Sequence, residues 1–351
     1  MIKNSVLDFL EKEIEAEHIP GAVIHVFYQG ETIVQEAIGN RVVYPEKFPM
    51  QLDTIFDLAS LTKVVAALPA ILTLIDNGEV RLDDRVAFFL PAFAVNGKEE
   101  VRLRHLLTHT SGLAAHRPFY LETLSKTEII EKICQEPLQH QIGEKVIYSD
   151  LNFILLSSIV ELVANISFAA FVKEKIFAPL GMHETSFNPT FVKTRYAATA
   201  YSEKHETYKQ GIVHDDNAEV LGGISGHAGL FSTIKDLAAY AEMIENDGIY
   251  QGKRMISKAA IALSRENFTA FDTEYRGIGW IIKNDADISS CGDLFSGSSY
   301  GHTGFTGTSI WFDPEIKLHI ILLTNRVHMK NTDAILRLRP RLHNLIRAYF
   351  S

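Results

Sequence analysis

The feature that most restricts the fold is where strand and helix patterns fall along the chain. Residues 21–43 alternate between apolar and polar positions and break at Gln29-Gly30, which predicts a hairpin. The other strand patterns occur only in the C-terminal third: "RGIGWII", "GTSIWFD" and "LHIILLTN". The segment between has mainly helical periodicity. We therefore expect an α/β (α+β) fold, in which strands from both termini form one antiparallel sheet flanked by helices, with a large helical insertion.

The chain has 351 residues, which is enough for one large domain. It contains no repeats, low-complexity tracts or clear linkers. We expect a single domain over residues 1–351. Residues 1–65 and 270–351 would form a lobe around the sheet, and residues 66–269 a mainly helical lobe.

Charge and terminal composition exclude several classes of protein. The net charge is −9 and no basic patch is present, which argues against nucleic acid as a partner. The first 22 residues carry acidic side chains at helical intervals and do not resemble a signal peptide. No apolar run approaches ~18 residues, so we expect no membrane segment. A cytoplasmic location is expected if no leader precedes this sequence. Cys134 and Cys291 lack CxxC spacing and are expected to be reduced.

A serine and a lysine begin one apolar helical stretch, "DLASLTKVVAAL". Ser60 and Lys63 are three residues apart and would lie on one face of a helix. Two interpretations are open. The pair is either a helix cap followed by a solvated lysine, or a nucleophile next to its base.

Four further stretches accompany "SLTK": "HLLTHTSGL" at 105–113, "YSDLNF" at 148–153, "GGISGHAGLFSTIKDLAAY" at 222–240 and "GHTGFTG" at 301–307. In this order and separation they resemble the serine β-lactamase and penicillin-binding protein family over residues 10–330. The resemblance is to its class C-like branch, and especially to the penicillin-binding protein 4B group. That branch also holds esterases, D-aminopeptidases and D-alanyl-D-alanine carboxypeptidases.

The resemblance implies a role for each matching residue. Ser60 matches the nucleophile that forms an acyl-enzyme, and Lys63 and Tyr148 match its two basic partners. Which of these two is the base stays open. The backbone N–H groups of Ser60 and Phe305 would form the oxyanion hole. Substrate binding is expected from a short set of residues: Asp150, His302, Thr303 and Gly304. The resemblance implies no cofactor and no metal.

Two positions depart from the family pattern. Asp150 stands where many class C enzymes have asparagine, and His302 stands where many have lysine. We expect Asp150 to keep Lys63 charged, which shifts the role of base to Tyr148. Loss of the asparagine amide disfavours efficient β-lactam hydrolysis, so D-amino-acid peptides or small esters are the expected substrates. His302 would titrate near pH ~6.5 and offer a charge to a substrate carboxylate only in acid.

Other motifs receive weaker interpretations. "GSSYG" places Ser299 in a G-x-S-x-G pattern, but strand-like residues follow where a nucleophile elbow needs a helix. His105 and His109 have a spacing that zinc sites use, but no HExxH glutamate accompanies them. His227 is expected to be a hydrogen-bonded structural residue that lines the cleft.

A non-enzymatic function stays open at this point. Some members of the family are penicillin-binding sensors or inactive binders. The serine, lysine and tyrosine of the motifs are all present here, so chemistry would be lost only through Asp150 or His302. The expected partner is a small-molecule or peptide substrate, and the sequence leaves the oligomeric state open.

Overall fold

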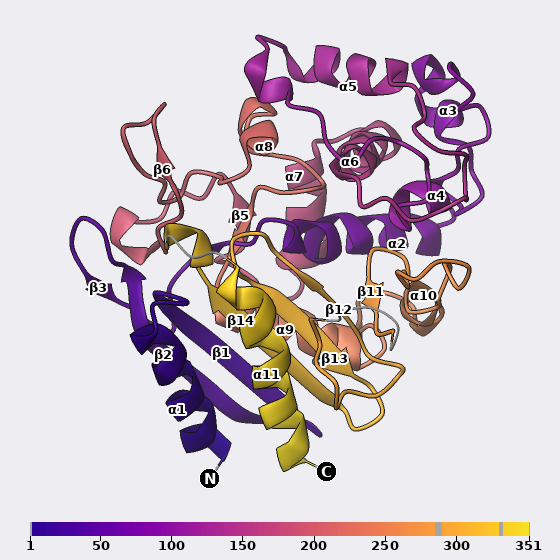
Figure 1. Cartoon of the computed structure of the whole chain (residues 1–351). Helices are drawn as coiled ribbons and strands as arrows, with labels where there is room; N and C mark the ends of the chain where they lie inside the picture. The colour runs from indigo at the N-terminus through magenta and orange to yellow at the C-terminus, as the bar shows by residue number, and fades with distance from the viewer. Residues whose placement is uncertain (1, 285–289, 330–332, 351) are drawn as a thin grey trace.

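The computed structural model describes residues 2–284, 290–329 and 333–350. Its centre is a seven-stranded antiparallel sheet in the order β11-β12-β13-β14-β1-β2-β3. The strands are β1 (Gly21–Tyr28), β2 (Glu31–Val42), β3 (Phe48–Pro49), β11 (Ile281–Ile282), β12 (Tyr300–Thr303), β13 (Ser309–Asp313) and β14 (Leu318–Thr324). Strand β1 pairs with β14, so strands from the N-terminal and C-terminal parts of the chain are neighbours in the middle of the sheet (Figure 1).

Both faces of the sheet are covered. The terminal helices α1 (Ile2–Glu15) and α11 (Ala334–Tyr349) lie on one face, and α9 (Ile234–Glu245) packs against β1 and β14 on the other (Figure 1). Side chains of a strand point alternately to the two faces. Ile320 and Leu322 of β14 accordingly join the core under the terminal helices, whereas Ile321 and Leu323 join the core of the rest of the protein.

The helical region packs above one end of the sheet (Figure 1). Its buried centre is the π-helical turn η1 (Lys63–Ala67), which continues into α2 (Leu68–Asp76), together with α6 (Asp150–Ala164). Around these lie smaller elements: α3 (Val86–Phe89), α4 (Leu103–Leu107), α5 (Lys126–Gln135), α7 (Phe168–Val172), η4 (Lys173–Phe177), α8 (Asp216–Val220) and α10 (Lys258–Ser264). The predicted architecture, a sheet from both termini with flanking helices and a helical insertion, is confirmed.

Two predicted elements are shorter than their sequence patterns. The helical periodicity of the middle segment predicts one helix over 150–176, but α6 ends at Ala164, because Asn165 adopts a left-handed conformation (φ 54°), and α7 starts after it. The strand expected at "RGIGWII" is only Ile281–Ile282. Gly279 has φ 76°, which is incompatible with an extended strand.

Among the described residues, no single helix is long and apolar enough to cross a membrane. Residues 150–164 and 168–177 reach the required length and composition only as a pair bent by 77°. Most side chains of α6 are buried in the protein core.

Candidate active site

Ser60 follows a tight turn after β4 (Phe56–Asp57). Ala59 has φ 46°, which is costly for a residue with a Cβ. The Asp57 carboxylate holds this turn, because its Oδ1 accepts the Ala59 N–H at 2.8 Å and its Oδ2 accepts the His214 N–H at 2.6 Å. Asp57 is therefore the residue that fixes the backbone in front of Ser60.

Burial raises the pKa of Asp57 from its ordinary 3.8 to about 6, against the two hydrogen bonds that lower it. A raised pKa in the folded state means that stability is lost as pH rises from about 4 to about 6. Asp57→Asn stays neutral and should lack this loss. We expect the free energy of unfolding of the variant, relative to the parent, to improve by up to about 3 kcal/mol over that interval. Urea titrations of both proteins from pH 4 to pH 7 would measure it, and parallel curves would contradict it.

Lys63 is completely buried and its ammonium donates three hydrogen bonds. The acceptors are Ser60 Oγ at 2.9 Å, Asp150 Oδ1 at 2.8 Å and the His227 carbonyl at 3.1 Å. Burial by itself lowers the pKa of Lys63, but the charges of Asp150 and Tyr148 outweigh it and raise that pKa above its ordinary value. Lys63 is thus a cation that holds Ser60 Oγ, as expected from the presence of Asp150.

Tyr148 is positioned by the segment that contains His109. The His109 carbonyl accepts the Ile147 N–H at 2.8 Å, and its Nδ1 accepts the Ser149 N–H at 3.0 Å. The imidazole lies 4.6 Å from the Tyr148 ring, centroid to centroid. The Lys63 ammonium lies 4.7 Å from the centroid of the Tyr148 ring. "LLTHTSGL" therefore shapes the active site through its backbone and one buried histidine.

The loop after β12 is fastened to the nucleophile turn. Thr306 Oγ1 donates to the Asp57 carbonyl at 2.7 Å, and Thr308 Oγ1 donates to the Leu58 carbonyl at 3.1 Å. A Cβ on Gly304 would lie 2.4 Å from the Leu58 carbonyl oxygen, so this glycine allows the loop to approach the turn. Over the described ranges, the N–H groups of Ser60 and Phe305 have no hydrogen-bond partner, as an oxyanion hole requires.

The prediction that His302 becomes positively charged in mild acid is wrong. The side chain is buried, 1% exposed, and its Nδ1 bonds the Thr303 carbonyl at 2.8 Å. Burial, followed by the charges of Arg276 and Lys63, lowers the pKa of His302 well below 6.5. The imidazole is therefore neutral throughout the ordinary pH range and supplies no charge to a substrate carboxylate. Thr303 is partly exposed at the end of β12.

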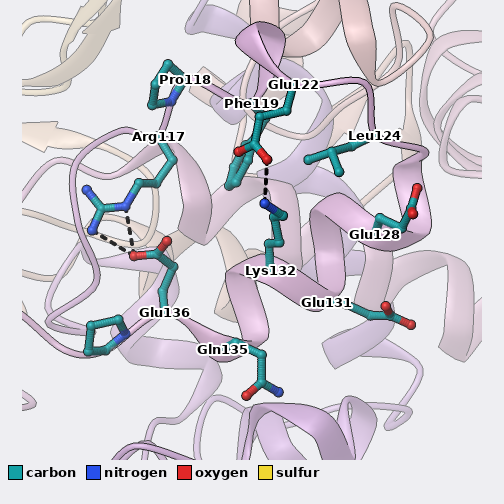
Figure 2. Close-up of a pocket in the computed structure, with 11 residues that line it drawn as sticks. Arg117, Pro118, Phe119, Glu122, Leu124, Glu128, Glu131, Lys132, Gln135 and Glu136 are labelled. Atoms are coloured by element: carbon teal, nitrogen blue, oxygen red, sulfur yellow. Dashed lines mark hydrogen bonds and ion pairs between the residues drawn. The ribbon is translucent and has the colours of Figure 1, made fainter.

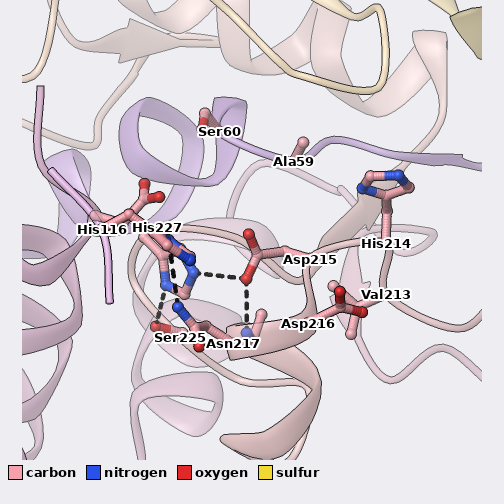
Figure 3. A network of polar contacts seen from close by, with 12 residues as sticks. Ala59, Ser60, His116, Val213, His214, Asp215, Asp216, Asn217, Ser225 and His227 are labelled. Carbon is pink, nitrogen blue, oxygen red and sulfur yellow. Dashed lines mark hydrogen bonds and ion pairs between the residues drawn. The ribbon is translucent and has the colours of Figure 1, made fainter. Parts of the chain in front are cut away.

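A second polar network lies beside the lysine. His227 is held between Ser225 Oγ, 2.7 Å from its Nδ1, and Asp215 Oδ1, 2.9 Å from its Nε2 (Figure 3). Asp215 also accepts the Ala218 N–H at the start of α8. Burial raises the pKa of Asp215, but the interactions with His227, the Ala218 N–H and Lys63 together outweigh it and lower that pKa. The predicted hydrogen-bonded role of His227 is confirmed, and through its carbonyl this network reaches Lys63.

Among the described residues, Asp150, Asp215 and His227 are the one group of potential metal ligands, with ligand atoms within 4.8 Å of one another. Two carboxylates and an imidazole suit a divalent cation. Here Asp150 already pairs with Lys63, and His227 Nε2 with Asp215. The arrangement is a set of ion pairs and hydrogen bonds around a lysine. His105 and His109 each accept a backbone N–H through Nδ1, from Arg102 and Ser149.

A separate hollow of about 530 Å³ lies beside α5 (Figure 2). It is rimmed by two ion pairs, Arg117 with Glu136 and Lys132 with Glu122. None of the predicted site residues lines it. The serines that locally resemble nucleophiles are buried: Ser299 is 0% and Ser225 2% exposed, whereas Ser60 is partly exposed. Of the rival serines, neither is open to a substrate.

Sequence comparison places these observations in a family. Residues 7–343 match the Beta-lactamase family, and the chain belongs to it. Over 314 residues it is 32% identical to a protein of Escherichia coli K12 named "Putative D-alanyl-D-alanine carboxypeptidase", covering 80% of this chain and 71% of that protein. A protein of the same name from Escherichia coli O157:H7 is 29% identical over 94% of this chain and 83% of its own. The chain is a serine hydrolase related to β-lactamases and penicillin-binding proteins.

Solved structures share the fold at lower identity. EstCE1, described as a hydrolase with promiscuous acyltransferase activity, superposes with a TM-score of 0.78 at 22% identity over 97% of this chain and 98% of its own. The octameric penicillin-binding protein homologue from Pyrococcus abyssi has a TM-score of 0.73 at 24% identity over 95% of this chain and 75% of its own. Simvastatin synthase from Aspergillus terreus has a TM-score of 0.79 at 19% identity over 100% of this chain and 99% of its own. These likenesses establish the β-lactamase/transpeptidase fold.

Proposed function

We propose that the chain hydrolyses D-amino-acid peptides or small esters through an acyl-enzyme on Ser60. The single observation that carries the proposal is the contact of Ser60 Oγ with the buried Lys63 ammonium, itself held by Asp150. A lysine kept charged is a poor proton acceptor, so Tyr148 is the better candidate for the base. The relatives named as D-alanyl-D-alanine carboxypeptidases support the peptide class.

The proposed reaction has two halves. Ser60 Oγ attacks the substrate carbonyl carbon while the Tyr148 oxygen takes its proton, and the carbonyl oxygen becomes negative between the N–H groups of Ser60 and Phe305. The carbonyl re-forms as the bond to the leaving amine or alkoxide breaks, and Tyr148 returns the proton to that group. Water then attacks the Ser60 ester by the same steps and releases the acid. Lys63 stays charged throughout and stabilises negative charge on the Tyr148 oxygen.

The polar groups near Ser60 bear on substrate choice. Asp150 replaces the amide that β-lactamases direct at the acylamido group of their drugs, and neutral His302 replaces a lysine. Both changes disfavour anionic β-lactams. We propose Asp150, His302, Thr303 and Gly304 as the substrate-binding edge, with His302 acting through its strand backbone, since its side chain is buried.

A labelling assay tests the proposal. The purified protein is treated with a fluorophosphonate and with a fluorescent penicillin, then screened on p-nitrophenyl esters, D-alanyl peptides and nitrocefin. An enzyme labels and recovers with turnover of one substrate class. A penicillin-binding sensor, the second candidate, labels and stays acylated. A protein that neither labels nor turns over any substrate would refute the proposal.

Asp150→Asn tests the reason given for weak β-lactam use. The variant restores an amide at this position and should raise turnover of nitrocefin relative to the parent, measured as kcat/KM. Asp216→Asn is a matched control, since Asp216 is a more exposed neighbouring acid that does not contact Lys63. If Asp150→Asn is no better than the parent, Asp150 does not limit β-lactam hydrolysis.

A further inference from the structure

Arg276 is a buried cation that the sequence analysis did not identify. It lies in the segment before β11, and its side chain is 4% exposed. Its guanidinium carbon is 5.2 Å from the centroid of the Tyr148 ring. Lys63 lies 4.7 Å from the same centroid. Tyr148 is therefore in contact with two cations, one from η1 and one from a distant segment.

The donors of Arg276 are only partly satisfied. Nη2 pairs with the carboxylate of Glu274, whereas Nε and Nη1 are buried and have no hydrogen-bond partner among the described residues. A buried guanidinium with unmet donors is costly. Glu274 is 34% exposed, so water screens its charge, while the face of the guanidinium toward Tyr148 is buried. The positive charge of the Arg276 guanidinium therefore acts mainly on Tyr148.

The backbone holds Arg276 in place. Its N–H donates to Thr269 Oγ1 at 2.7 Å, and Thr269 Oγ1 donates to the Glu274 carbonyl at 2.8 Å. Asp272 of the same loop accepts the Val146 N–H at 2.8 Å, two residues before Tyr148. This loop therefore contacts the tyrosine segment both through the Asp272 carboxylate and through the Arg276 guanidinium.

The other charged groups around Tyr148 do not substitute for the charge of Arg276. The titratable groups packed near it are Lys63, Asp150, Asp272, Glu274, His109 and His302. Burial and the charge of Arg276 are the two largest causes that lower the pKa values of His109 and His302, so both imidazoles are neutral. Lys63 is paired with Asp150, and Arg276 is paired with Glu274, which is the more exposed of the two carboxylates. The charge of Arg276 is therefore the less neutralised of the two positive charges near Tyr148.

We propose that Arg276 is a positioning residue for Tyr148, and that it supplies the second positive charge of the active site, which His302 does not carry. The inference rests on the proposed function of Tyr148 as the base. Arg276 stabilises the negative charge on the Tyr148 oxygen and holds the ring against Lys63. The positive charge that many family members carry at the position of His302 is here supplied by Arg276, from a different segment of the chain.

A double-mutant cycle tests the proposal. Arg276→Met keeps most of the apolar bulk and removes the charge, and should lower kcat/KM for a neutral p-nitrophenyl ester by about 10- to 100-fold, most strongly at low pH. Arg276→Lys should recover much of the loss. In a Tyr148→Phe background, Arg276→Met should change the rate less than about twofold, because the effect acts through the tyrosine. Arg265→Met is the matched control, since Arg265 lies 5.0 Å from the Tyr300 ring instead.

A readout without substrate separates this inference from the proposed function. The tyrosinate absorbance of the parent minus that of Tyr148→Phe reports on Tyr148 alone. We expect it to appear at higher pH in Arg276→Met than in the parent, and to be unchanged in Arg265→Met. An unchanged titration, or an equal loss of rate in the Tyr148→Phe background, would overturn the proposal. If Arg276→Met does not fold, as judged by circular dichroism, the same titration is made with Arg276→Gln.

Discussion

Ser60→Ala should abolish labelling by a fluorophosphonate and lower kcat by at least about a thousandfold, as loss of a covalent nucleophile does. Ser60 is the partly exposed serine whose Oγ contacts a buried ammonium, at the end of a turn fixed by Asp57. Digestion and mass spectrometry of the labelled parent should place the adduct on the peptide that contains Ser60. The measurement is kcat for the best ester or peptide substrate.

Folding of Ser60→Ala should be nearly unchanged, because Lys63 keeps two other acceptors. The thermal midpoint provides this check. Ser299→Ala and Ser225→Ala are the matched controls, and both should still label. An adduct on Ser299, or full activity of Ser60→Ala, would contradict the mechanism.

Lys63→Met is expected to have the second largest effect, with a loss of kcat/KM of about a thousandfold. The substitution keeps most of the apolar part of the side chain but removes the cation that holds Ser60 Oγ and faces Tyr148. It also leaves Asp150 without its partner, which should cost about 3 kcal/mol of stability. Activity and urea unfolding of the same preparation give both quantities.

The double variant Lys63→Met/Asp150→Asn separates the two losses. Removing the uncompensated carboxylate should recover part of the stability, while activity stays lost because the cation is still absent. Recovery of activity together with stability would mean that Lys63 serves only to hold the fold. Activity of the single variant within tenfold of the parent would remove Lys63 from the mechanism.

The main features of the fold were predictable because they rest on hydrophobic periodicity. Alternation at 21–43 and the apolar run in "LHIILLTN" predicted strands that pair in the structure, and the turn at Gln29-Gly30 was correct. The segment "RGIGWII" misled because its apolar residues suit a strand, whereas the backbone angle at Gly279 does not. Periodicity reports which side chains are buried and carries no information on single backbone angles.

Parts of the site depend on contacts that no local pattern contains. The contact of Lys63 with Asp150 spans 87 positions, and we expected it only through the family resemblance. Asp57 had a local signal that we did not use, since an aspartate two residues before a turn commonly bonds its backbone. The protonation state of His302 depends on its burial by surrounding elements. Arg276 contacts Tyr148 only because the loop 267–276 packs against the segment that contains the tyrosine. Neither is encoded in nearby residues.

The pairing of β1 with β14 also affects how the chain is made. Thr324 Oγ1 bonds the Gly21 carbonyl across 303 positions, and these two strands are neighbours at the centre of the sheet. During synthesis, β1 and β2 therefore leave the ribosome long before their central partner exists. An apolar strand with one open edge must wait for nearly the whole chain, which favours slow folding and transient aggregation. Residues 21–28 are accordingly where we expect a chaperone to bind the nascent protein.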